Sequence, residues 1–573
     1  MKETFYFNRN TALINYTKKY CTTPDELISS EGFSAFLDLF FDHIQKTNSN
    51  MYDWLMNSAP FNVSSFELRN VIKQELMRLL KILLVLEVEE IHHPYLVDRG
   101  RFLDLIEAAY QFWRKMERYS IVFSLHSEGY QMANFIEADT EYNALCLNFY
   151  RTIQQKVQGS KNQVYRQLQA GTNASLLLKE YEWDVPEGYE KLANIPFVHQ
   201  IMLRTPLIIH PKHNKRHGLY SEHTHNPMED FVADRNEWIC LPVKVGGLLM
   251  FAYFHRDFMS GAVATPNLFE MASAEECTGH KPDAIMLFGN PDGTKDTVFW
   301  HDEENNIWIG KVSADERIDY FGYVKKMMLT LHNLAVMEKG WLPIHGAMVK
   351  FYLKDGTQKS LMFMGDSGAG KSETIEALSV ISKDVIDHQE VIFDDMGSIH
   401  IDEDGNLVAQ GTEIGAFVRL DDLDKGTAYK DMDRSIFFNP ESANARVVVP
   451  AASYDVVVTN QKIDCFMYAN NYTDARGMRQ FTTKEEAMPT FVEGKRFALG
   501  TTQEKGISTT FFANPFGPMQ KQEKCSKIIE QVFDKLFEKN IFVGEIYTCL
   551  GLENKGDNGI EKAAECLLEF VQK

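Results

Sequence analysis

The sequence predicts a protein of the mixed α/β class that is divided into three consecutive parts. In the first 180 residues, apolar residues recur at three- and four-residue spacing, which is typical of helices. Beyond residue 181 the apolar runs are shorter and are broken by Pro and Gly, which favours a small α/β or α+β domain. Beyond residue 291 an apolar strand runs directly into a glycine-rich loop and a helix, as in α/β nucleotide-binding domains. We therefore expect domains at 1–180, 181–290 and 291–573.

Length and composition indicate a folded, multidomain protein whose main partner is not a nucleic acid. At 573 residues the chain exceeds what one hydrophobic core usually organises. Apolar residues make up 44% of it and charged residues 24%, which is typical of globular domains rather than disordered segments. The formal net charge of −21 opposes binding to a polyanion, since such binding depends on Lys and Arg at phosphates. A nucleotide pocket needs only local positive charge.

No segment of the sequence predicts a membrane or secretory destination. The first ten residues lack the apolar core of a signal peptide. The longest apolar run, Leu79–Val88, contains charged residues and is too short to span a bilayer. The eight cysteines are scattered without a close pair, which favours reduced thiols over a disulfide framework or a zinc site. We therefore expect a cytoplasmic protein that does not bind membranes.

The first part is predicted to be an all-helical accessory domain. Its helical patterns cover Phe33–Ile44, Ser65–Glu90, Arg101–Arg118 and Glu141–Val157. No combination of residues in this part suggests chemistry. A homodimer formed through this helical region is a further expectation.

The second part combines predicted strands with a histidine-rich loop. The strands cover Ile201–Ile209, Trp238–Val243 and Gly246–Phe254, and a small-molecule sensor fold is one interpretation of them. Five histidines lie between the first two strands: His210, His213, His217, His223 and His225. Imidazole is a common metal ligand, yet no cysteine or paired carboxylate completes a ligand set, and basic residues are interspersed. A solvated basic loop is favoured over a metal site, and both interpretations stay open.

The third part begins with a helix and a hairpin that lead to the glycine-rich loop. Tyr320–Met337 has a helical pattern, and Ala347–Leu353 and Ser360–Met364 alternate apolar and polar residues as strands do. Lys354–Gly356, between the two strands, is a turn sequence typical of a hairpin. The second strand of this hairpin therefore ends at the loop that starts with Gly365.

That loop has the spacing of a phosphate-binding Walker A motif. Its glycines allow backbone conformations that are closed to other residues, and the first free amides of the following helix attract an anion. The predicted nucleotide-binding residues are Gly365, Asp366, Ser367, Gly368, Ala369, Gly370, Lys371, Ser372 and Glu373. Lys371 is expected to reach the β- and γ-phosphates of ATP, and Ser372 to bind the bridging Mg²⁺. The alternative is a strand-to-helix turn that binds nothing.

Two aspartates are candidates for metal binding and proton transfer. Glu390–Phe393 has the pattern of a buried strand, which is predicted to end at Asp394 and Asp395. In nucleoside triphosphatases, a carboxylate at such a strand end holds magnesium near the phosphate loop. One aspartate can then bind metal while the other orients water or acts as a base. An acidic turn without function is the alternative.

Residues 277–573 resemble the phosphoenolpyruvate carboxykinases and, more distantly, the HPr kinase/phosphorylases of the same P-loop superfamily. The segment Tyr320–Lys326 (YFGYVKK) is similar to the carboxykinase segment Tyr-Ala-Gly-Glu-Met-Lys-Lys. This match implies that Tyr320 and Lys325 face the substrate and that Lys326 binds the transition metal. A lysine must be neutral to bind a metal, and neighbouring cations promote the neutral form by lowering the lysine pKa.

Two further segments complete the metal site that the resemblance implies. Leu342–Ala347 is similar to the carboxykinase segment Met-Pro-Met-His, whose histidine binds Mn²⁺ and corresponds to His345. Asp394 and Asp395 match the element Gly-Asp-Asp, whose second aspartate binds the same ion. The resemblance thus implies one Mn²⁺ site formed by Lys326, His345 and Asp395.

The remaining matches concern the phosphoryl group and the nucleotide. Asn444–Pro450 resembles Asn-Thr-Arg-Val-Ser-Tyr-Pro, whose arginine bridges the transferring phosphoryl group and the substrate. This match implies that Arg446 neutralises charge in the transition state. Gly500–Gly506 and Phe512–Gly517 resemble carboxykinase segments near the nucleobase, which implies proximity to the nucleotide.

The acceptor side departs from the carboxykinase pattern. Carboxykinases have Thr-Gly-Arg-Ser-Pro-Lys-Asp, with an arginine that holds the substrate carboxylate, whereas the nearest match here, Thr278–Asp283, has His280 in its place. Histidine lacks the permanent bidentate charge of a guanidinium. Candidates for a replacement are Arg204, Arg476 and Arg479. The loop sequence GDSGAGKSE is also closer to that of the HPr kinases.

Three functional hypotheses follow, and ATP is not distinguished from GTP in any of them. The leading one is the carboxykinase reaction, in which oxaloacetate and ATP give phosphoenolpyruvate, ADP and CO₂ with Mg²⁺ and Mn²⁺ as cofactors. Its catalytic residues are Tyr320, Lys325, Lys371, Asp394 and Arg446. The second is a kinase or phosphorylase for a protein serine or a small-molecule hydroxyl, with Asp394 or Asp395 as base. The third is a non-catalytic ATP-binding sensor whose output is carried by the first 290 residues.

Overall fold

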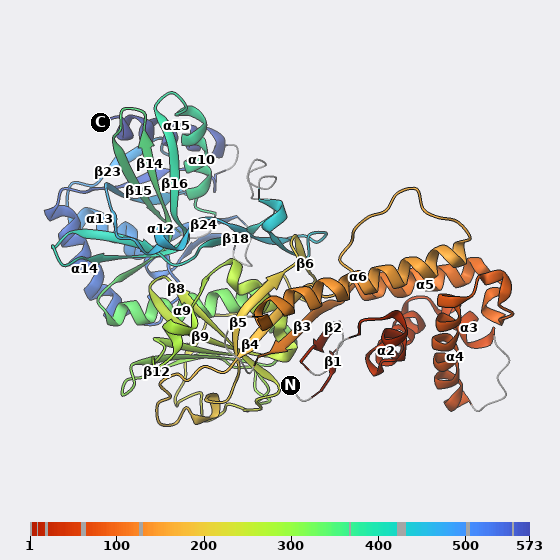
Figure 1. Cartoon of the computed structure of the whole chain (residues 1–573). Coiled ribbons are helices and arrows are strands. Elements are labelled where there is room, and N and C mark those ends of the chain that lie inside the picture. Colours follow the sequence, from red (N-terminus) through yellow and green to blue (C-terminus); the bar gives the residue numbers. More distant parts are fainter. Residues whose placement is uncertain are drawn as a thin grey trace. The chain divides into compact units, whose positions relative to one another are not determined.

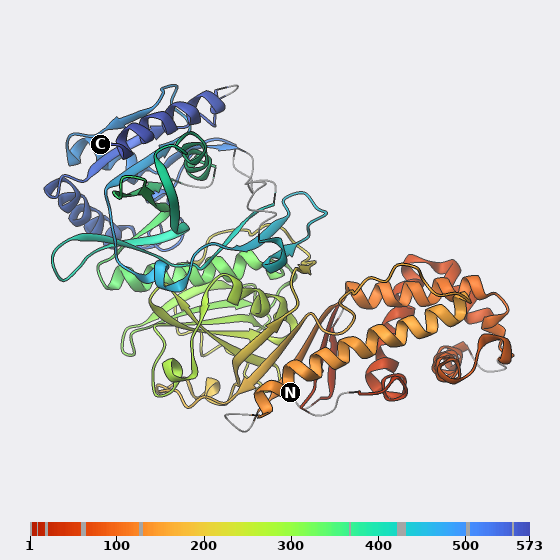
Figure 2. The same ribbon diagram turned by 45° about the horizontal axis from the view of Figure 1, so that its top comes forward.

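The computed structural model describes residues 3–8, 10–17, 21–58, 65–124, 130–365, 368–420, 431–499, 505–552 and 555–573. These residues form a mixed α/β protein in two compact units (Figures 1 and 2). Unit 1 contains Met1–Tyr181, Ile195–Leu207 and Asp234–Ile239, and unit 2 contains Glu182–Asn194, Ile208–Ala233 and Cys240–Lys573. The finer division into three domains stays a prediction.

Unit 1 combines a helical region with a small sheet. Its helices are α1 (Pro24–Ser29), α2 (Glu31–Thr47), α3 (Ser49–Asn57), α4 (Ser65–Val85), α5 (Arg99–Lys115) and α6 (Tyr130–Gln158), with 3₁₀ turns η1 (Val88–Glu90) and η2 (Pro94–Leu96). Its strands are β1 (Phe5–Asn8), β2 (Thr11–Asn15), β3 (Glu117–Phe123), β4 (Ala174–Lys179) and β5 (Phe197–Leu203). They neighbour one another in this order, and the pairs β2/β3 and β3/β4 are parallel.

The four predicted helices are present as α2, α4, α5 and α6. The prediction that residues 1–180 are all helical is wrong, because β1 to β4 lie within this range. Two of these strands have only four and five residues, and such short segments are stabilised by pairing with distant strands rather than by a pattern of their own.

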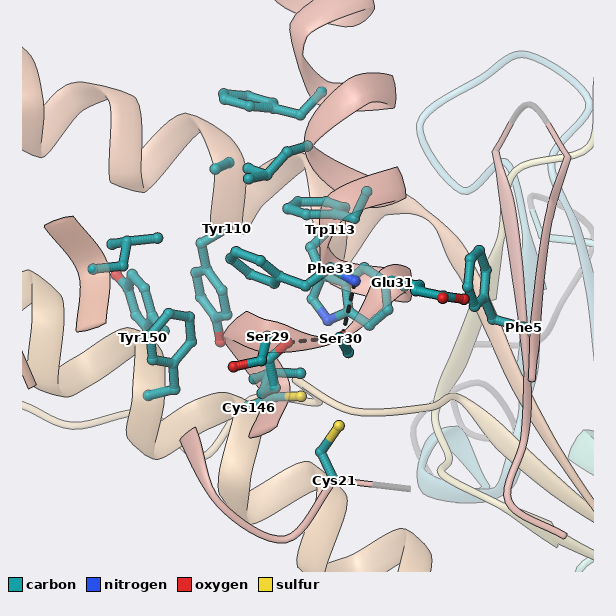
Figure 3. Close-up of a pocket in the computed structure, with 18 of the residues that line it drawn as sticks. Phe5, Cys21, Ser29, Ser30, Glu31, Phe33, Tyr110, Trp113, Cys146 and Tyr150 are labelled. Carbon is teal, nitrogen blue, oxygen red and sulfur yellow. Dashed lines mark hydrogen bonds between the residues drawn. The ribbon is translucent and has the colours of Figure 1, made fainter. Parts of the chain in front are cut away.

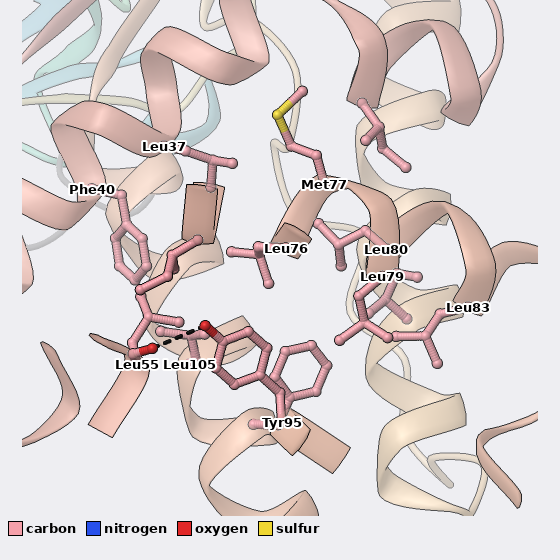
Figure 4. Close-up of a cluster of buried hydrophobic side chains, with 14 of the residues drawn as sticks. Leu37, Phe40, Leu55, Leu76, Met77, Leu79, Leu80, Leu83, Tyr95 and Leu105 are labelled. Atoms are coloured by element: carbon pink, nitrogen blue, oxygen red, sulfur yellow. Dashed lines mark hydrogen bonds between the residues drawn. The ribbon is translucent and has the colours of Figure 1, made fainter. Parts of the chain in front are cut away.

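The helices of unit 1 pack around a shared apolar core. Helix α5 begins after Asp98, whose carboxylate accepts a hydrogen bond from the amide of Arg101 at 3.1 Å, and basic residues complete its last turn. Helices α5 and α6 run side by side (Figures 1 and 2). Figure 4 shows leucines of α2, α4 and α5 meeting beside Tyr95, whose hydroxyl donates to the carbonyl of Leu55 at 2.9 Å.

The first sheet of unit 2 supports a long buried helix. Its strands follow the order β8 (Trp238–Val245), β9 (Leu248–His255), β11 (Ala284–Asn290), β13 (Ile307–Ser313), β12 (Thr297–Asp302) and β7 (Ser221–Glu222), and β10 (Glu270–Met271) pairs with β8. Helix α9 (Phe321–Glu338) contacts β11 and β13 of this sheet and also β14 and β16 of the next. Nearly all of its residues are buried, as expected of a helix packed between layers.

The second sheet of unit 2 has eight strands. Their order is β21 (Gln461–Lys462), β17 (Leu407–Gly411), β16 (Ile386–Ile401), β14 (Leu342–Leu353), β15 (Gln358–Met364), β22 (Cys465–Asn470), β26 (Phe542–Tyr547) and β23 (Met478–Gln480). Strand β14 is antiparallel to both neighbours, whereas β15, β22 and β26 are parallel. Helices α10 (Lys371–Ile381) and α15 (Gly556–Val571) pack together against this sheet (Figure 1).

Smaller elements complete unit 2. The strands are β18 (Gly415–Arg419), β20 (Arg446–Pro450), β19 (Ile436–Phe438) and β6 (Leu207–Ile209) in one sheet, and β24 (Lys495–Leu499) with β25 (Lys505–Thr509) in another. The remaining helices are α7 (Met259–Ala264), α8 (Ala274–Cys277), α12 (Tyr454–Val458), α13 (Lys484–Glu493), α14 (Gln522–Glu538), η3 (Glu190–Leu192), η4 (Arg256–Phe258), η5 (Thr265–Asn267), η6 (Glu316–Ile318), η7 (Met432–Arg434) and η8 (Phe511–Ala513). Among the described residues, no helix combines the length and apolar character needed to cross a bilayer.

The predicted hairpin is confirmed, since β14 pairs with β15 across the turn at Lys354–Gly356. The prediction that a strand ends at Asp394 and Asp395 is wrong. Strand β16 continues to Ile401 because β14 pairs with it along its whole length, so both aspartates lie in its interior. The predicted strand Ile201–Ile209 is instead divided into β5 and β6 around Pro206, which has no N–H for a ladder.

Candidate functional site

The glycine-rich loop connects β15 to α10, as its sequence predicts. Gly368 and Gly370 have φ angles of 78° and 95°, a region that favours glycine. A Cβ at Gly370 would also lie 2.7 Å from Thr548. The loop is held by Asn471, which donates to the carbonyl of Gly368 at 3.0 Å, and by the Thr548 hydroxyl, which donates to the carbonyl of Ala369 at 2.8 Å. Two predicted residues, Asp366 and Ser367, lie outside the described residues.

The start of α10 presents the other predicted residues of the loop. Lys371 is buried, and its Nζ donates to the carbonyl of Gly365 at 2.7 Å. The Ser372 hydroxyl lies 3.3 Å from Oδ1 of Asp394, and Glu373 is exposed in the first helical turn. The loop is therefore linked to the interior of β16 through a serine and an aspartate, the pair expected to hold a metal ion.

A cluster of charged side chains forms where α9, β14 and β16 meet. The Nζ atoms of Lys325 and Lys326 lie 2.6 Å and 2.7 Å from Oδ2 of Asp395. Nε2 of His345 lies 3.1 Å from Oδ1 of the same carboxylate. The structure thus brings together the three residues that the resemblance assigns to one ion, Lys326, His345 and Asp395. The amide of Gly365 donates to the carbonyl of His345 at 3.1 Å, so the cluster adjoins the glycine-rich loop.

The two ring nitrogens of His345 face different partners. Nδ1 lies 2.8 Å from the carbonyl oxygen of Ala513, which only accepts, so Nδ1 carries a hydrogen. Nε2 of the neutral ring then directs a lone pair at the Asp395 carboxylate. Nε2 of His345 and Oδ1 of Asp395 would then face each other with lone pairs. A cation between them, either a proton or a metal ion, would remove this repulsion. A carbonyl that orients a ligating histidine is a common feature of metal sites.

The pKa values in the cluster are shifted in different directions. Burial opposes ionisation of Asp395, but Lys325 and Lys326 outweigh it and hold the pKa of this carboxyl well below its usual range. Burial also lowers the pKa of Lys326, and the neighbouring Lys325 adds to this effect. For Lys325, burial is outweighed by Asp395 and Glu413, which raise its pKa. Of the two lysines, Lys326 is therefore the one that loses its proton more readily, as a metal ligand must.

Glu413 is a member of the cluster that the sequence did not indicate. Its Oε1 lies 3.0 Å from Nζ of Lys325, and its side chain is buried. Burial raises its pKa from 4.5 to about 7, against the opposing effect of Lys325. A carboxyl that titrates near neutrality can exchange a proton with a substrate. Glu413 lies between β17 and β18 and belongs to no motif, so only the fold places it here.

The substrate-side residues predicted from the resemblance lie around the Phe417 ring. The ring of Tyr320 lies 6.0 Å from it, Nζ of Lys325 lies 5.9 Å and Cζ of Arg446 lies 5.8 Å from its centroid. Burial raises the pKa of Tyr320. Arg446 donates through Nη2 to Asn444 at 3.2 Å, and its buried Nε–H has no hydrogen-bond partner within the described part of the chain. An unsatisfied guanidinium donor at this place is suited to an anionic ligand.

A second arginine faces Arg446. Arg419 is its register partner across β18 and β20, so the two side chains lie on the same face of this ribbon. Two cations in directly opposed positions repel each other. Arg419 was not a candidate from the sequence, because the pairing of β18 with β20 joins residues 27 positions apart and no local pattern reports it.

Phe516 lies between the cluster of charged side chains and the histidine-rich loop. Its ring centroid lies 4.6 Å from Nζ of Lys326, 6.3 Å from the ring of His345 and 5.2 Å from Cζ of Arg216. The segment predicted to lie near the nucleobase thus contacts the predicted metal residues. Arg216 also donates to the carbonyl of Gly218. It is a cation beside the cluster that sequence reasoning missed, and the basic character of its loop was the available signal.

The residues considered for the missing substrate arginine have other partners. Asp283, at the end of the Thr278–Asp283 segment, is 3.5 Å from Lys339, at the opposite end of α9 from Lys325. Arg204 pairs with Asp139 in unit 1. The other two candidates, Arg476 and Arg479, pair with Asp474 and Glu486.

Only part of the histidine cluster comes together in the described residues. His223 and His225 lie with Asp230, and their Nε2 atoms are 3.6 Å and 3.3 Å from its Oδ2. Nδ1 of His223 accepts a hydrogen bond from the amide of Thr224 at 2.8 Å, which places the ring hydrogen on Nε2 in the neutral form. In this form Nε2 of His223 has no lone pair for a metal ion, and it faces the Asp230 carboxylate beyond hydrogen-bond distance. This geometry favours the polar-loop interpretation for His223.

A comparison of the chain with protein-family models and with curated proteins finds no match.

Proposed function

We propose that the protein catalyses metal-dependent transfer of a phosphoryl group from ATP, in a reaction of the phosphoenolpyruvate carboxykinase type. One observation carries the proposal. The adjacent residues Asp394 and Asp395 connect Ser372 of the glycine-rich loop with the cluster of Lys325, Lys326 and His345. A nucleotide site and a second cation site that share one strand segment are suited to a transfer between a triphosphate and a bound acceptor.

The glycine-rich loop supplies the nucleotide side. Its αL glycines and the first amides of α10 suit a triphosphate. Lys371 is expected to exchange its bond with the Gly365 carbonyl for one with a phosphate oxygen. Ser372 and Asp394 are expected to hold Mg²⁺, because a hydroxyl and a carboxylate are ligands that this ion prefers.

The donor set of the cluster fits a second divalent ion. The three side chains are an amine from Lys326, an imidazole from His345 and a carboxylate from Asp395. The amine and the imidazole both lie within hydrogen-bond distance of the carboxylate. The lowered pKa of Lys326 and the orientation of His345 favour ligands in their metal-binding forms. A bound Mn²⁺ would polarise an acceptor oxygen and neutralise charge on the transferring group.

Cationic side chains are expected to form the acceptor side. The Phe417 ring has Lys325 and Arg446 near it, and Arg419 lies on the same strand. Arg216 lies beside Phe516. Oxaloacetate is a dianion and suits such an environment. Loss of CO₂ breaks its carbon–carbon bond and leaves an enolate. The enolate oxygen then attacks the γ-phosphorus and displaces ADP, which gives phosphoenolpyruvate.

The proposal is tested by incubating the full-length protein with ATP, Mg²⁺, Mn²⁺ and oxaloacetate, and by following ADP, phosphoenolpyruvate and CO₂. We expect equimolar release of the three products, which Asp395→Asn abolishes. The control Asp404→Asn changes an exposed carboxylate in the turn after β16 and should keep full activity. Nucleotide turnover that does not depend on oxaloacetate would remove the carboxykinase assignment.

A kinase acting on a protein serine or a small-molecule hydroxyl is the second candidate. It is favoured by Asp394, whose pKa burial raises and whose neighbour is Ser372, because a less acidic carboxylate is the better base toward a hydroxyl. Asp395 is less suited to this role, since two lysines hold its pKa low. Transfer of labelled γ-phosphate to a serine peptide or an alcohol would support this candidate. Tight ATP binding without turnover of any acceptor would instead indicate a sensor.

A further inference from the structure

Unit 1 contains a cavity of about 540 Å³ that the proposed function does not use. It lies among α2, α4, α5, α6 and the first two strands, and all of its lining residues belong to unit 1 (Figure 3). Protein interiors are close-packed and have few voids larger than a water molecule. A cavity of this volume is in the range of sites for small organic molecules.

Aromatic side chains form much of the wall. Figure 3 shows the rings of Phe33, Tyr110 and Trp113 around the same space, and Phe36 and Tyr142 also line it. These walls are fixed by their own contacts. Trp113 donates to the carbonyl of Ala170 at 2.6 Å, and the Tyr110 ring stacks on Tyr150 with centroids 3.6 Å apart. Rigid aromatic walls favour a ligand with a flat ring, which can stack on them.

The charge of the lining restricts the ligand further. Among the described residues that line the cavity, there is no lysine, arginine or histidine, and Glu31 is the charged one. Glu31 is exposed, as is the neighbouring Ser29, so these residues form a polar edge rather than part of the interior. An anionic ligand would lose its hydration without gaining a counter-charge from any of these lining side chains. A neutral ligand avoids this cost.

One polar group inside the wall is unsatisfied. The Tyr110 hydroxyl is buried and has no hydrogen-bond partner within the described residues. Burial raises the pKa of Tyr110, so the hydroxyl stays neutral and can both donate and accept. Buried hydroxyls without a partner are costly, and a ligand with one hydrogen-bonding group would remove this cost.

We propose that this cavity is a binding site for a neutral, largely apolar molecule that has an aromatic ring and one hydrogen-bonding group directed at Tyr110. The volume sets the size of the ligand, the aromatic wall favours the ring, and the absence of lining cations among the described residues excludes a preference for acids. The proposal does not depend on nucleotide binding or catalysis.

The test uses N-phenyl-1-naphthylamine, a neutral aromatic fluorophore with one N–H, titrated into the full-length protein without nucleotide or metal. The control probe is its anionic relative 1-anilinonaphthalene-8-sulfonate, which has the same rings and an added sulfonate. We expect saturable binding of the neutral probe with one site per chain, at least tenfold tighter than the anionic probe. Equal binding of both probes would overturn the proposal, because it would indicate unspecific apolar surface.

A matched pair of variants locates the site. Ala109 lines the cavity, whereas Ala108, its neighbour on α5, packs against the same helices without lining it. Ala109→Phe should fill the space and weaken binding of the neutral probe at least tenfold, while Ala108→Phe should leave the affinity within twofold. Circular dichroism and thermal unfolding check that both variants fold. Retained affinity in a folded Ala109→Phe protein would contradict the proposal.

A milder variant tests the hydroxyl. Tyr110→Phe keeps the ring and removes only the oxygen, so folding should be preserved. We expect the neutral probe to bind about threefold to tenfold more weakly, the effect of one lost hydrogen bond. An unchanged affinity would remove the role of Tyr110. Because phosphoryl transfer is not measured, failure here and failure of the proposed reaction are separate outcomes.

Discussion

Unit 2 contains two buried lysine clusters that differ in how their charges are balanced. In the first, Lys325 and Lys326 share Asp395, and Glu413 lies beside Lys325. In the second, the fully buried Lys311 is surrounded by three aspartates: its Nζ lies 2.8 Å from Asp230, 3.1 Å from Asp292 and 3.1 Å from Asp296.

The pKa shifts show the difference between the clusters. Burial of Lys311 is outweighed by its hydrogen bonds to the three aspartates, and its pKa is raised. The hydrogen bond from Lys311 lowers the pKa of Asp230, and bonds from Thr294 lower that of Asp292 in spite of burial. The pKa shifts of Lys311, Asp230 and Asp292 all favour the charged form, as in an ion cluster that serves stability.

The site cluster is not balanced in this way. Asp395 is held ionised, whereas Lys326 and Glu413 are both shifted toward their neutral forms. Groups whose charged forms are disfavoured in a buried place are costly to keep, and they are concentrated at functional sites. We therefore propose that the site cluster, unlike the Lys311 cluster, is prepared for a cation or a proton.

The largest effect is expected on stability in the Lys311 cluster. Lys311→Met removes the cation and leaves three neighbouring carboxylates without it, so the free energy of unfolding should fall by about 3–5 kcal/mol. Activity per folded molecule should stay unchanged. Urea unfolding measures the first effect. A loss of activity without a loss of stability would reverse the assignment of the two clusters.

The opposite result is expected for Lys326→Met in the site cluster. Phosphoryl transfer should fall about 100- to 1,000-fold, because a proposed ligand of the second cation is removed. Stability should change by less than about 1 kcal/mol, since Lys325 still pairs with Asp395. Lys339→Met, at the other end of α9, is the control and should keep the wild-type rate. A destabilised but active Lys326→Met protein would falsify the proposed role.

Binding of Mn²⁺ gives a third distinction. At a metal concentration 100 times the dissociation constant, the ion should stabilise the fold by about 2.7 kcal/mol. His345→Ala should abolish this gain, and Lys311→Met should keep it although its baseline is lower. Thermal unfolding with and without Mn²⁺, after removal of metal by a chelator, makes the measurement. Equal stabilisation of wild type and His345→Ala would place the metal elsewhere.

Local sequence patterns predicted the parts of the site that are continuous in the chain. The hairpin, the loop at Gly365–Ser372 and the helix at Tyr320–Met337 follow from spacing and turn chemistry. The meeting of Lys326, His345 and Asp395 came only from the family resemblance, because 69 residues separate the lysine from the aspartate. Periodicity does not report such contacts.

The residues that were missed depend on strand pairing and loop packing. Glu413 and Arg419 reach the site because β17 and β18 pair with β16 and β20, and Arg216 because its loop packs on Phe516. The cavity in unit 1 was also beyond prediction. A helical pattern shows which face is buried, but it does not show how completely that face is filled.

A pH dependence also distinguishes the two clusters. The folded protein holds the Glu413 proton up to a pKa of about 7, whereas an unfolded chain releases it near 4.5. Between these values only the folded state binds the proton, so the free energy of unfolding should fall as pH rises, by about 1.4 kcal/mol per pH unit from this carboxyl. The lowered pKa values of Asp395, Asp230 and Asp292 act with the opposite sign and only below pH 3.8.

The measurement compares urea unfolding of metal-free wild type and Glu413→Gln from pH 4 to pH 8. The variant cannot titrate at this position, so the difference between the two curves should change across pH 4.5–7 and be flat above it. Asp230→Asn is the matched control in the Lys311 cluster, and its difference from wild type should change only at the acid end. If Glu413→Gln runs parallel to wild type throughout, Glu413 is ionised in the fold. The site would then be a balanced ion cluster like that of Lys311, and it would not be prepared for proton transfer.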